Sequence, residues 1–294
     1  MLSWLRQFNI FCFLDSHDYQ VNPTSYNCLV AAGVKFEIET DSLTDIDTFI
    51  SGHHSWIFGH LSYELKNSIH HLKPSIEDKV GFPLMFFFVP EYIILLKGEE
   101  IIIHAEDPAA ICQEINSVTL GNSGHKESEI RFREELTKET YLEKIRQLKE
   151  HLHRGDCYEI NFCQEFYAEN AYIDPFQVHQ QLMEISPNPF SAFYRLKDKY
   201  VICASPERFL SKKGSRIYSQ PIKGTIRRNK EDVTEDAVLK NQLQQNQKER
   251  SENVMVVDMV RSDLGKICDS VKVEELFGIY TYPQVHQMIS TISG

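Results

Sequence analysis

Two short segments of the chain hold side chains that could carry out nucleophilic and acid–base chemistry. Glu207 lies in the segment ASPERF and Lys223 lies in the segment SQPIKGT. Pro221 fixes its own φ and Gly224 permits a positive φ or a close approach, so the backbone around Lys223 has little freedom. Such a backbone can aim a lysine into a pocket, where a desolvated amine acts as a nucleophile or base. A carboxylic acid on a neighbouring element can then protonate a leaving group.

Both residues also have an ordinary explanation. Lysine side chains are mostly solvated at protein surfaces. Glu207 could simply pair in solvent with a nearby basic residue, namely Arg208, Lys212 or Lys213. Exposed ion pairs of that kind contribute little to stability and nothing to catalysis. The chemical interpretation therefore depends on what other segments supply.

A third segment, KERSENVMVVDMVRSD, adds carboxylates within a long helix predicted over residues 236–264. Glu249 and Glu252 are three residues apart and share one helix face. The sequence turns apolar directly after Asn253, so Glu252 stands where polar surface becomes core. Because Mg²⁺ takes one or two carboxylates together with waters and substrate oxygens, Glu252 is a candidate magnesium ligand. Glu249 fits better in a solvated Glu/Lys face.

These segments, taken in order, resemble the chorismate-utilising enzymes. The matching motifs are GDCYEIN, ASPERFL, QPIKGT, ERSENVMVVDMVRSDLG and VHQMISTISG, with looser matches at FLDS and WIFGHLSYEL nearer the N-terminus. That family includes anthranilate synthase component I, aminodeoxychorismate (para-aminobenzoate) synthase component I, isochorismate synthase and salicylate synthase. The resemblance covers nearly the whole chain. It implies an α+β fold with two facing antiparallel β-sheets and helices on the outside, with the C-terminal part of the family core missing.

Within this family, the resemblance implies that a lysine at position 223 marks one type of enzyme, because the other types usually carry alanine there. The resemblance then implies an aminodeoxychorismate synthase, a transferase in para-aminobenzoate and folate biosynthesis. Lys223 would add to C2 of chorismate as the 4-hydroxyl leaves, and Glu207 would protonate that hydroxyl. Ammonia would attack C4 and expel the lysine, giving 4-amino-4-deoxychorismate. No Cys-His amidotransferase signature is visible, so a glutamine amidotransferase subunit is expected as the partner that supplies ammonia.

The same resemblance implies further binding residues. Glu252 would hold Mg²⁺ against the ring carboxylate of chorismate. Gly224 and Thr225 would contact the substrate, as would Gln287, which stands where the family usually has histidine. A glutamine can form a hydrogen bond with a hydroxyl but cannot transfer a proton.

Three alternatives stay open. An anthranilate synthase component I with an atypical lysine is the first. A non-catalytic fragment that binds tryptophan or chorismate is the second, because Leu14, Asp15 and Ser16 resemble the stretch that forms a tryptophan site in this family. The third concerns Glu159, which falls where the isochorismate synthases carry a lysine base. A carboxylate there disfavours direct water addition, but a solvent-facing strand residue fits Glu159 equally well.

Composition limits the remaining classes. The chain has 294 residues, 42% hydrophobic and 25% charged, as in ordinary soluble globular proteins. A net charge of −11 without a basic block argues against nucleic acid as a partner. The apolar stretch over 81–96 is too short and too often interrupted to span a membrane, and no signal peptide is apparent. The seven cysteines are scattered without a C-x-x-C pair, which favours the cytoplasm.

The elements that would position these residues alternate between strands and helices. Strands are predicted within 8–16, 55–65, 157–169 and 270–280, a hairpin over 91–106, and three strands over 191–225. Helices are predicted over 136–156, 175–186 and 236–264, with another beginning within 282–294. The polar segment 121–129 predicts a boundary between an N-terminal region of the anthranilate synthase component I type, 1–125, and a chorismate-binding catalytic core, 126–294. Because that core is cut short relative to the family, this stretch alone is expected to be inactive.

Overall fold

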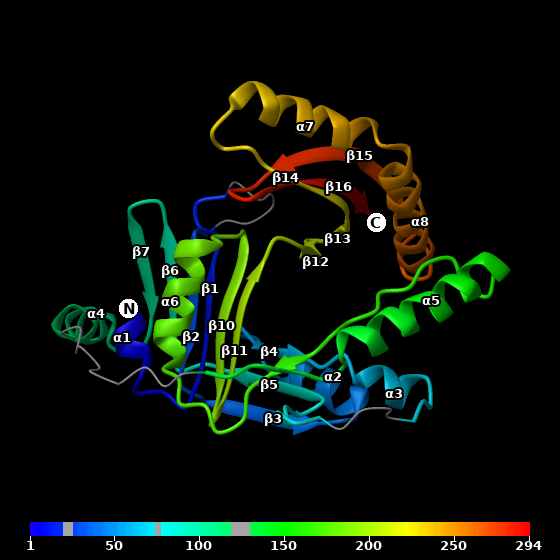
Figure 1. Ribbon diagram of the computed structural model, residues 1–294. Helices are drawn as coiled ribbons and strands as arrows, with labels where there is room; N and C mark the ends of the chain where they lie inside the picture. The colour runs from blue at the N-terminus through cyan, green and yellow to red at the C-terminus, as the bar shows by residue number, and fades with distance from the viewer. Residues whose placement is uncertain (20–25, 74–77, 119–129) are drawn as a thin grey trace. The chain divides into compact units, whose positions relative to one another are not determined.

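The computed structural model of the chain describes residues 1–19, 26–73, 78–118 and 130–294 (Figure 1). Contacts within the chain divide it into two units, residues 1–120 with 176–294 and residues 121–175. The predicted boundary segment 121–129 lies outside the described residues, so the division at 125/126 stays a prediction. The larger unit is built on antiparallel sheets with helices packed against them, which confirms the predicted α+β class.

A six-stranded sheet combines strands from both ends of the larger unit. Its order is β11-β10-β1-β2-β6-β7, and every neighbouring pair is antiparallel. The strands are β1 (Ile10–Asp15), β2 (Cys28–Ala32), β6 (Tyr92–Lys97), β7 (Glu100–His104), β10 (Phe190–Leu196) and β11 (Lys199–Ser205). The predicted hairpin over 91–106 is confirmed by β6 and β7. The sheet takes strands from both sides of the predicted domain boundary.

Alternate residues of β1 pack on opposite faces of this sheet, so both faces are covered. Phe11 and Phe13 pack in a core with side chains of the helices α1 (Leu2–Leu5), α4 (Pro108–Ser117) and α6 (Pro175–Ile185). Ile10 packs on the other face against a three-stranded sheet of β3 (Phe36–Thr40), β5 (Met85–Val89) and β4 (Phe58–Leu61). The helices α2 (Leu43–Gly52) and α3 (Leu65–Ile69) add Ile46 and Leu65 to a smaller cluster with Met85.

A second large sheet carries the candidate chemistry. It contains β12 (Arg208–Lys213), β13 (Arg216–Gln220), β14 (Ile222–Arg227), β15 (Lys272–Thr281) and β16 (Val285–Ser293). The order is β12-β13-β16-β14, and β15 also pairs with β16. The helices α7 (Val233–Gln245) and α8 (Gln247–Leu264) contact this sheet, and Val257 and Leu264 of α8 share a core with Ile292 of β16. Figure 1 shows both helices lying along the sheet, in yellow to orange.

Three predictions for this region were wrong in detail. The predicted helix over 236–264 is two helices, because Asn246 adopts an extended ψ of 112° and its side chain caps α8 by accepting from the backbone N–H of Glu249. The segment 282–294, predicted to begin a helix, forms β16, where the pairing to three strands outweighs local preference. The region 191–225 holds β10 to β14 instead of three strands.

The smaller unit contains α5 (Lys138–Arg154) and a short ladder of β8 (Arg133–Glu134) with β9 (Phe166–Tyr167). Thr137 caps α5 at its start, and Gly155, with φ 80°, ends it in the left-handed region, within the helix predicted over 136–156. The strand predicted over 157–169 is mostly irregular and is reduced to β9. No helix in the described part of the chain is both long and apolar enough to cross a bilayer.

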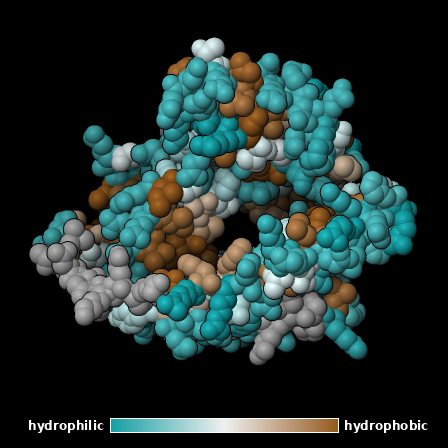
Figure 2. Space-filling view, viewed as in Figure 1, coloured by the Kyte–Doolittle hydropathy of each residue, from teal (hydrophilic) through white to brown (hydrophobic). Residues whose placement is uncertain are grey.

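The face of the molecule shown in Figure 2 is mainly hydrophilic, with hydrophobic residues gathered in smaller patches. Exposed apolar side chains occur on α7, where Val233 and Val238 are 82% and 61% exposed. Scattered exposed apolar residues of this kind are ordinary for a folded protein.

Candidate functional site

Lys223 lies in a β-bulge where β14 meets β16. Ile222 pairs with Ile289 and Thr225 pairs with Gln287, so that Lys223 and Gly224 together oppose the single residue Met288. Gly224 has a φ of +103°, which confirms the expectation of a glycine-dependent backbone next to the lysine. A bulge bends its strand and re-aims the side chains at the extra position. The backbone thus presents Lys223 differently from a regular strand residue.

Consecutive residues of α8 contact the two ends of Lys223. The Nδ2 of Asn253 donates a hydrogen bond to the backbone carbonyl of Lys223 at 3.3 Å. The Oε2 of Glu252 lies 4.0 Å from the Lys223 Nζ, and the two side chains are 24% and 26% exposed. The lysine amine is therefore half-buried beside a carboxylate, not extended into bulk solvent.

Behind Asn253 stands a buried serine that sequence reasoning missed. The Ser290 hydroxyl donates to the Asn253 Oδ1 at 2.6 Å and accepts from the Phe277 backbone N–H at 3.2 Å. Asn253 is 1% exposed and Ser290 is fully buried. Its role was not visible in the sequence, because 282–294 was predicted to start a helix and the contact with Asn253 depends on β16 pairing with distant strands.

Glu207, directly before β12, reaches the same segment. Its Oε1 accepts a hydrogen bond from the backbone N–H of Ile222, the residue before Lys223, at 3.2 Å. Its own N–H donates to the Ser205 hydroxyl at 3.1 Å. The structure thus places the predicted acid and the predicted nucleophile next to the same short stretch of β14.

Glu252 is shared between two lysines. Its Oε1 lies 2.9 Å from the Nζ of Lys248, one turn earlier in α8, and Lys248 also lies 3.3 Å from an oxygen of Glu249. The hydrogen bonds with Glu252 and then Glu249 raise the pKa of Lys248. Within the described residues there is no cluster of three or more potential metal-ligating side chains. Glu252 alone could hold a magnesium ion only if water and substrate supplied the other ligands, and Lys248 already contacts its Oε1.

The remaining predicted substrate-binding residues lie across the same strand pair. Gln287 Nε2 donates to the Thr225 hydroxyl at 3.4 Å, across their paired positions on β16 and β14. The Gln287 Oε1 is buried without a hydrogen-bond partner among the described residues. The structure therefore gathers the predicted site residues around one bulge, namely Glu207, Lys223, Gly224, Thr225, Glu252 and Gln287.

The possible tryptophan residues lie elsewhere in the larger unit. Leu14 and Asp15 end β1 of the six-stranded sheet, and Ser16 follows them. The Asp15 Oδ1 accepts from the backbone N–H of His17 at 2.8 Å, and Ser16 is buried. Glu159 lies in the smaller unit, in the irregular segment between α5 and β9.

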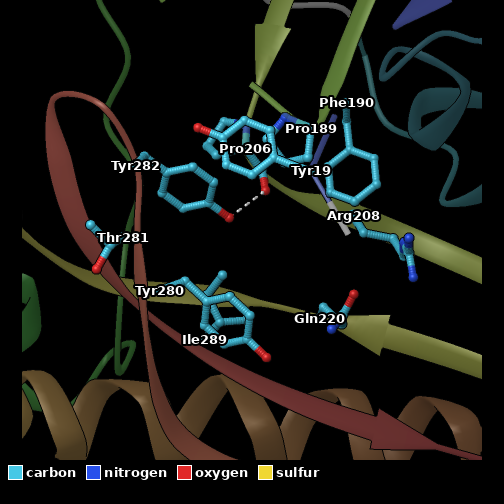
Figure 3. Close-up of a pocket in the computed structure, with 10 residues that line it drawn as sticks. All are labelled: Tyr19, Pro189, Phe190, Pro206, Arg208, Gln220, Tyr280, Thr281, Tyr282 and Ile289. Carbon is cyan, nitrogen blue, oxygen red and sulfur yellow. Dashed lines mark hydrogen bonds between the residues drawn. The ribbon is translucent and has the colours of Figure 1, made fainter. Parts of the chain in front are cut away.

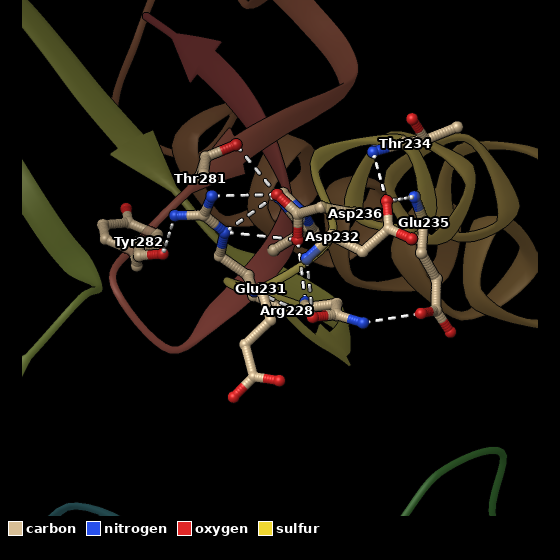
Figure 4. A network of polar contacts seen from close by, with 10 residues as sticks. Arg228, Glu231, Asp232, Thr234, Glu235, Asp236, Thr281 and Tyr282 are labelled. Carbon is tan, nitrogen blue, oxygen red and sulfur yellow. Dashed lines mark hydrogen bonds and ion pairs between the residues drawn. The ribbon is translucent and has the colours of Figure 1, made fainter.

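A buried ion network holds the far end of the β14–β16 pair (Figure 4). Arg228 donates to the Asp236 carboxylate at 2.8 Å, and the other Asp236 oxygen lies 3.1 Å from the His286 Nε2. Thr281 contacts the second ring nitrogen of His286 at 3.0 Å, and Arg228 also donates to the Tyr282 carbonyl. The hydrogen bonds from Arg228 lower the pKa of Asp236 to about 2. His286 is 1% exposed, and both of its ring nitrogens lie in this network.

A small aromatic pocket opens on the second large sheet (Figure 3). Its walls include Tyr19, Phe190, Arg208, Tyr280 and Tyr282, and the Tyr282 hydroxyl donates to the Pro206 carbonyl at 3.5 Å. The volume is about 90 Å³, far below the roughly 300–1,000 Å³ of typical ligand pockets. This pocket therefore does not replace the residues around Lys223 as the candidate site.

Comparison with known proteins identifies relatives. Residues 22–294 match a family described as chorismate binding enzyme. The chain is 32% identical over 241 residues to aminodeoxychorismate synthase component 1 of Klebsiella aerogenes, covering 80% of this chain and 53% of that protein. It is 43% identical over 161 residues to aminodeoxychorismate synthase component 1 of Escherichia coli (strain K12), covering 54% and 35%. The chain spans about half the length, or less, of these relatives.

Solved structures share the fold. Anthranilate synthase component I from Streptococcus pneumoniae superposes with a TM-score of 0.78 at 21% identity, over 95% of this chain and 71% of that one. The menaquinone-specific isochorismate synthase of Escherichia coli gives 0.74 at 14% identity, over 99% and 66%. At these identities the likeness shows the fold alone.

Proposed function

This chain belongs to the chorismate binding enzyme family, and from that premise we propose that it aminates chorismate to 4-amino-4-deoxychorismate. Two of its relatives carry the name aminodeoxychorismate synthase component 1. The observation that carries the proposal is the position of Lys223. The lysine lies in a bulge, half-buried, between the carboxylate of Glu252 and the segment that Glu207 contacts. A lysine amine is the nucleophile that a covalent substitution on the ring requires.

The proposed reaction consists of two allylic displacements. In the first, the neutral Lys223 amine forms a bond to C2, the ring double bonds shift, and the C4–O bond breaks. Glu207 gives its proton to the leaving hydroxyl, which departs as water, and then takes a proton from the new C2 ammonium. In the second, ammonia bonds to C4, the double bonds shift back, and the C2–N bond breaks. Glu207 returns the proton to the departing lysine and takes one from the new C4 ammonium, so that the enzyme is restored.

The other residues around the bulge bind and orient the substrate. Thr225 and Gln287 present a hydroxyl and an amide at neighbouring positions, suited to the ring hydroxyl and carboxylate of chorismate. Glu252 would hold Mg²⁺, which when bound neutralises a substrate carboxylate. Glu252 otherwise faces the amines of Lys223 and Lys248.

We propose a glutamine amidotransferase subunit as the source of ammonia, and para-aminobenzoate and folate synthesis as the pathway. The relatives named component 1 support a partner component. The partner, the substrate and the activity belong to the whole protein, since this chain spans about half of its relatives.

Anthranilate synthesis is the second candidate, because a relative in Arabidopsis thaliana, 35% identical over 161 residues, is named anthranilate synthase alpha subunit 1. The two reactions differ in product. Anthranilate is fluorescent and forms with loss of pyruvate, whereas 4-amino-4-deoxychorismate keeps the enolpyruvyl group. A fragment that only binds tryptophan or chorismate would form neither, and calorimetry with each ligand would detect it.

The experiment is to express the complete reading frame, supply chorismate, ammonium and Mg²⁺, and separate the products by chromatography. Aminodeoxychorismate in the wild type, and its loss in Lys223→Ala but not in Lys212→Ala at an exposed β12 position, supports the proposal. Anthranilate with pyruvate would overturn it in favour of the second candidate. Unchanged amination in Lys223→Ala would remove the covalent mechanism. The same assay on residues 1–294 alone tests the prediction that this stretch is inactive by itself.

A further inference from the structure

The bulge that carries Lys223 is contacted by one buried polar side chain, and this contact has a specific direction. Asn253 Nδ2 donates to the carbonyl of Lys223, the residue at the extra position of the bulge. In a regular ladder that carbonyl would face a partner strand, but the register shift changes its pairing. Because a hydrogen bond to a backbone carbonyl contributes to stability, the amide of Asn253 stabilises this local backbone.

The orientation of the Asn253 amide is itself fixed. Ser290 donates to Asn253 Oδ1, so the oxygen must face the serine and the NH₂ group must face the bulge. Ser290 is oriented in turn because its oxygen accepts from the Phe277 backbone N–H. Both side chains are fully or almost fully buried, so water does not compete with these hydrogen bonds. The chain of bonds therefore runs in one direction, from β15 through β16 and α8 to β14.

The same helix also contacts the other end of the lysine. Glu252, directly before Asn253, lies 4.0 Å from the amine. The backbone of Lys223 thus contacts Asn253, and its amine lies near Glu252, the adjacent residue of α8. Any shift of Asn253 relative to the bulge alters where the amine lies relative to Glu252.

We propose that Asn253 is a positioning residue for the Lys223 nucleophile, oriented by Ser290. The inference rests on the proposed function, since it concerns the placement of the amine for attack on chorismate. Asn253 touches neither substrate nor reacting atoms; it acts through the backbone of Lys223. A displacement of about 1 Å at a reacting group can reduce the rate on the order of 10²-fold, so a single hydrogen bond at this point matters.

The first test needs no activity. Native protein is acylated briefly with a limiting amine reagent, and the labelling of Lys223 relative to the exposed Lys212 is measured by peptide mass spectrometry. In Asn253→Asp and Ser290→Ala, we expect the ratio to rise by about threefold or more, because a side chain released from its contacts becomes more accessible. Ser290→Ala decides the matter if Asn253→Asp does not fold.

The matched control is Ser293→Ala on the same strand. Ser293 is also buried and donates to the Glu274 Oε1 at 2.7 Å, but its bond does not lead to Lys223. A ratio that stays at the wild-type value in the test variants, or that rises equally in Ser293→Ala, would overturn the proposal. The second result would indicate general loosening of the sheet.

The second test is kinetic and separates this inference from the proposed function. If the complete protein aminates chorismate, kcat should fall about 10-fold or more in Ser290→Ala, with KM for chorismate within about threefold of the wild type. An unchanged kcat together with a raised labelling ratio would also overturn the proposal. If the wild type forms no aminated product, the proposed function fails, and the labelling ratio still decides whether Asn253 positions Lys223.

Discussion

The Oε1 of Glu252 lies 2.9 Å from the Nζ of Lys248, one helical turn earlier in α8. Lys248 therefore occupies one of the two carboxylate oxygens that a Mg²⁺ ion could use. Because the pair is exposed on the lysine side, removing the lysine should tighten Mg²⁺ binding by up to about fivefold, the factor that an exposed ion pair is worth. Titration calorimetry of Lys248→Met with MgCl₂ measures this. Glu252→Gln should lose the binding, and an unaltered affinity there would exclude Glu252 as the ligand.

Glu207→Gln should lower kcat for chorismate amination on the order of 10²- to 10⁴-fold, because glutamine keeps the acceptor for the Ile222 N–H but has no proton to give. The matched control is Glu99→Gln in the exposed turn between β6 and β7. Steady-state kinetics on the complete protein provide the measurement. Full activity in Glu207→Gln would assign the proton donor elsewhere.

Gly224→Ala should destabilise the fold by about 1–3 kcal/mol, because a residue with a side chain is strained at this backbone conformation. A Cβ there would also lie 3.2 Å from the Cβ of Glu249. Gly214→Ala is the control, since Gly214 has φ +61° but open space around it, and we expect a cost of about 1 kcal/mol. Urea unfolding measures the free energy of unfolding of both variants. Equal losses of stability would mean that the crowding at Glu249 is relieved at no cost.

The Asp236 carboxylate should make stability depend on pH below 4. Its pKa is lowered from 3.8 to about 2, chiefly by Arg228, so its contribution is fully present above pH 4. The contribution is lost as the pH falls through 2. Asp236→Asn should therefore be less stable than the wild type near neutral pH, and the difference should shrink between pH 4 and 2. Chemical unfolding between pH 4 and 2 measures this difference in stability, with Asp258→Asn at an exposed position as the control.

Cys28 should resist thiol reagents in the folded protein. Burial, and then the charge of Asp15, raise the pKa of the Cys28 thiol to about 12. Cys112 on α4 is exposed. Iodoacetamide at pH 8 should modify Cys112 within the time that leaves Cys28 untouched, and urea should abolish the difference. Rapid native modification of Cys28 would contradict the pairing of β1 with β2.

The residues that could carry out chemistry were predicted from the sequence, but the buried hydrogen bonds that position them were not. Pro221 and Gly224 bracket Lys223, and this local pattern predicts a constrained backbone that the bulge confirms. Glu252 could be placed at the edge of the core because the run after Asn253 is apolar. The role of Ser290 could not be predicted, since it depends on β16 pairing with strands far away in sequence. Local preference favoured a helix in that segment. The break at Asn246 was missed because Asn is tolerated inside helices and its capping bond appears only in three dimensions.

The strand β16 also sets an order of events during synthesis. Among the described strands, β14 pairs only with β16, and the two helices and β15 lie between them in the chain. A nascent polypeptide that has left the ribosome as far as α8 already holds Glu207 and Glu252 but has no Met288 to form the bulge against. The bulge around Lys223 thus forms late, once β16 has paired with β14. A partly synthesised chain contains Lys223 but not the backbone geometry that positions it.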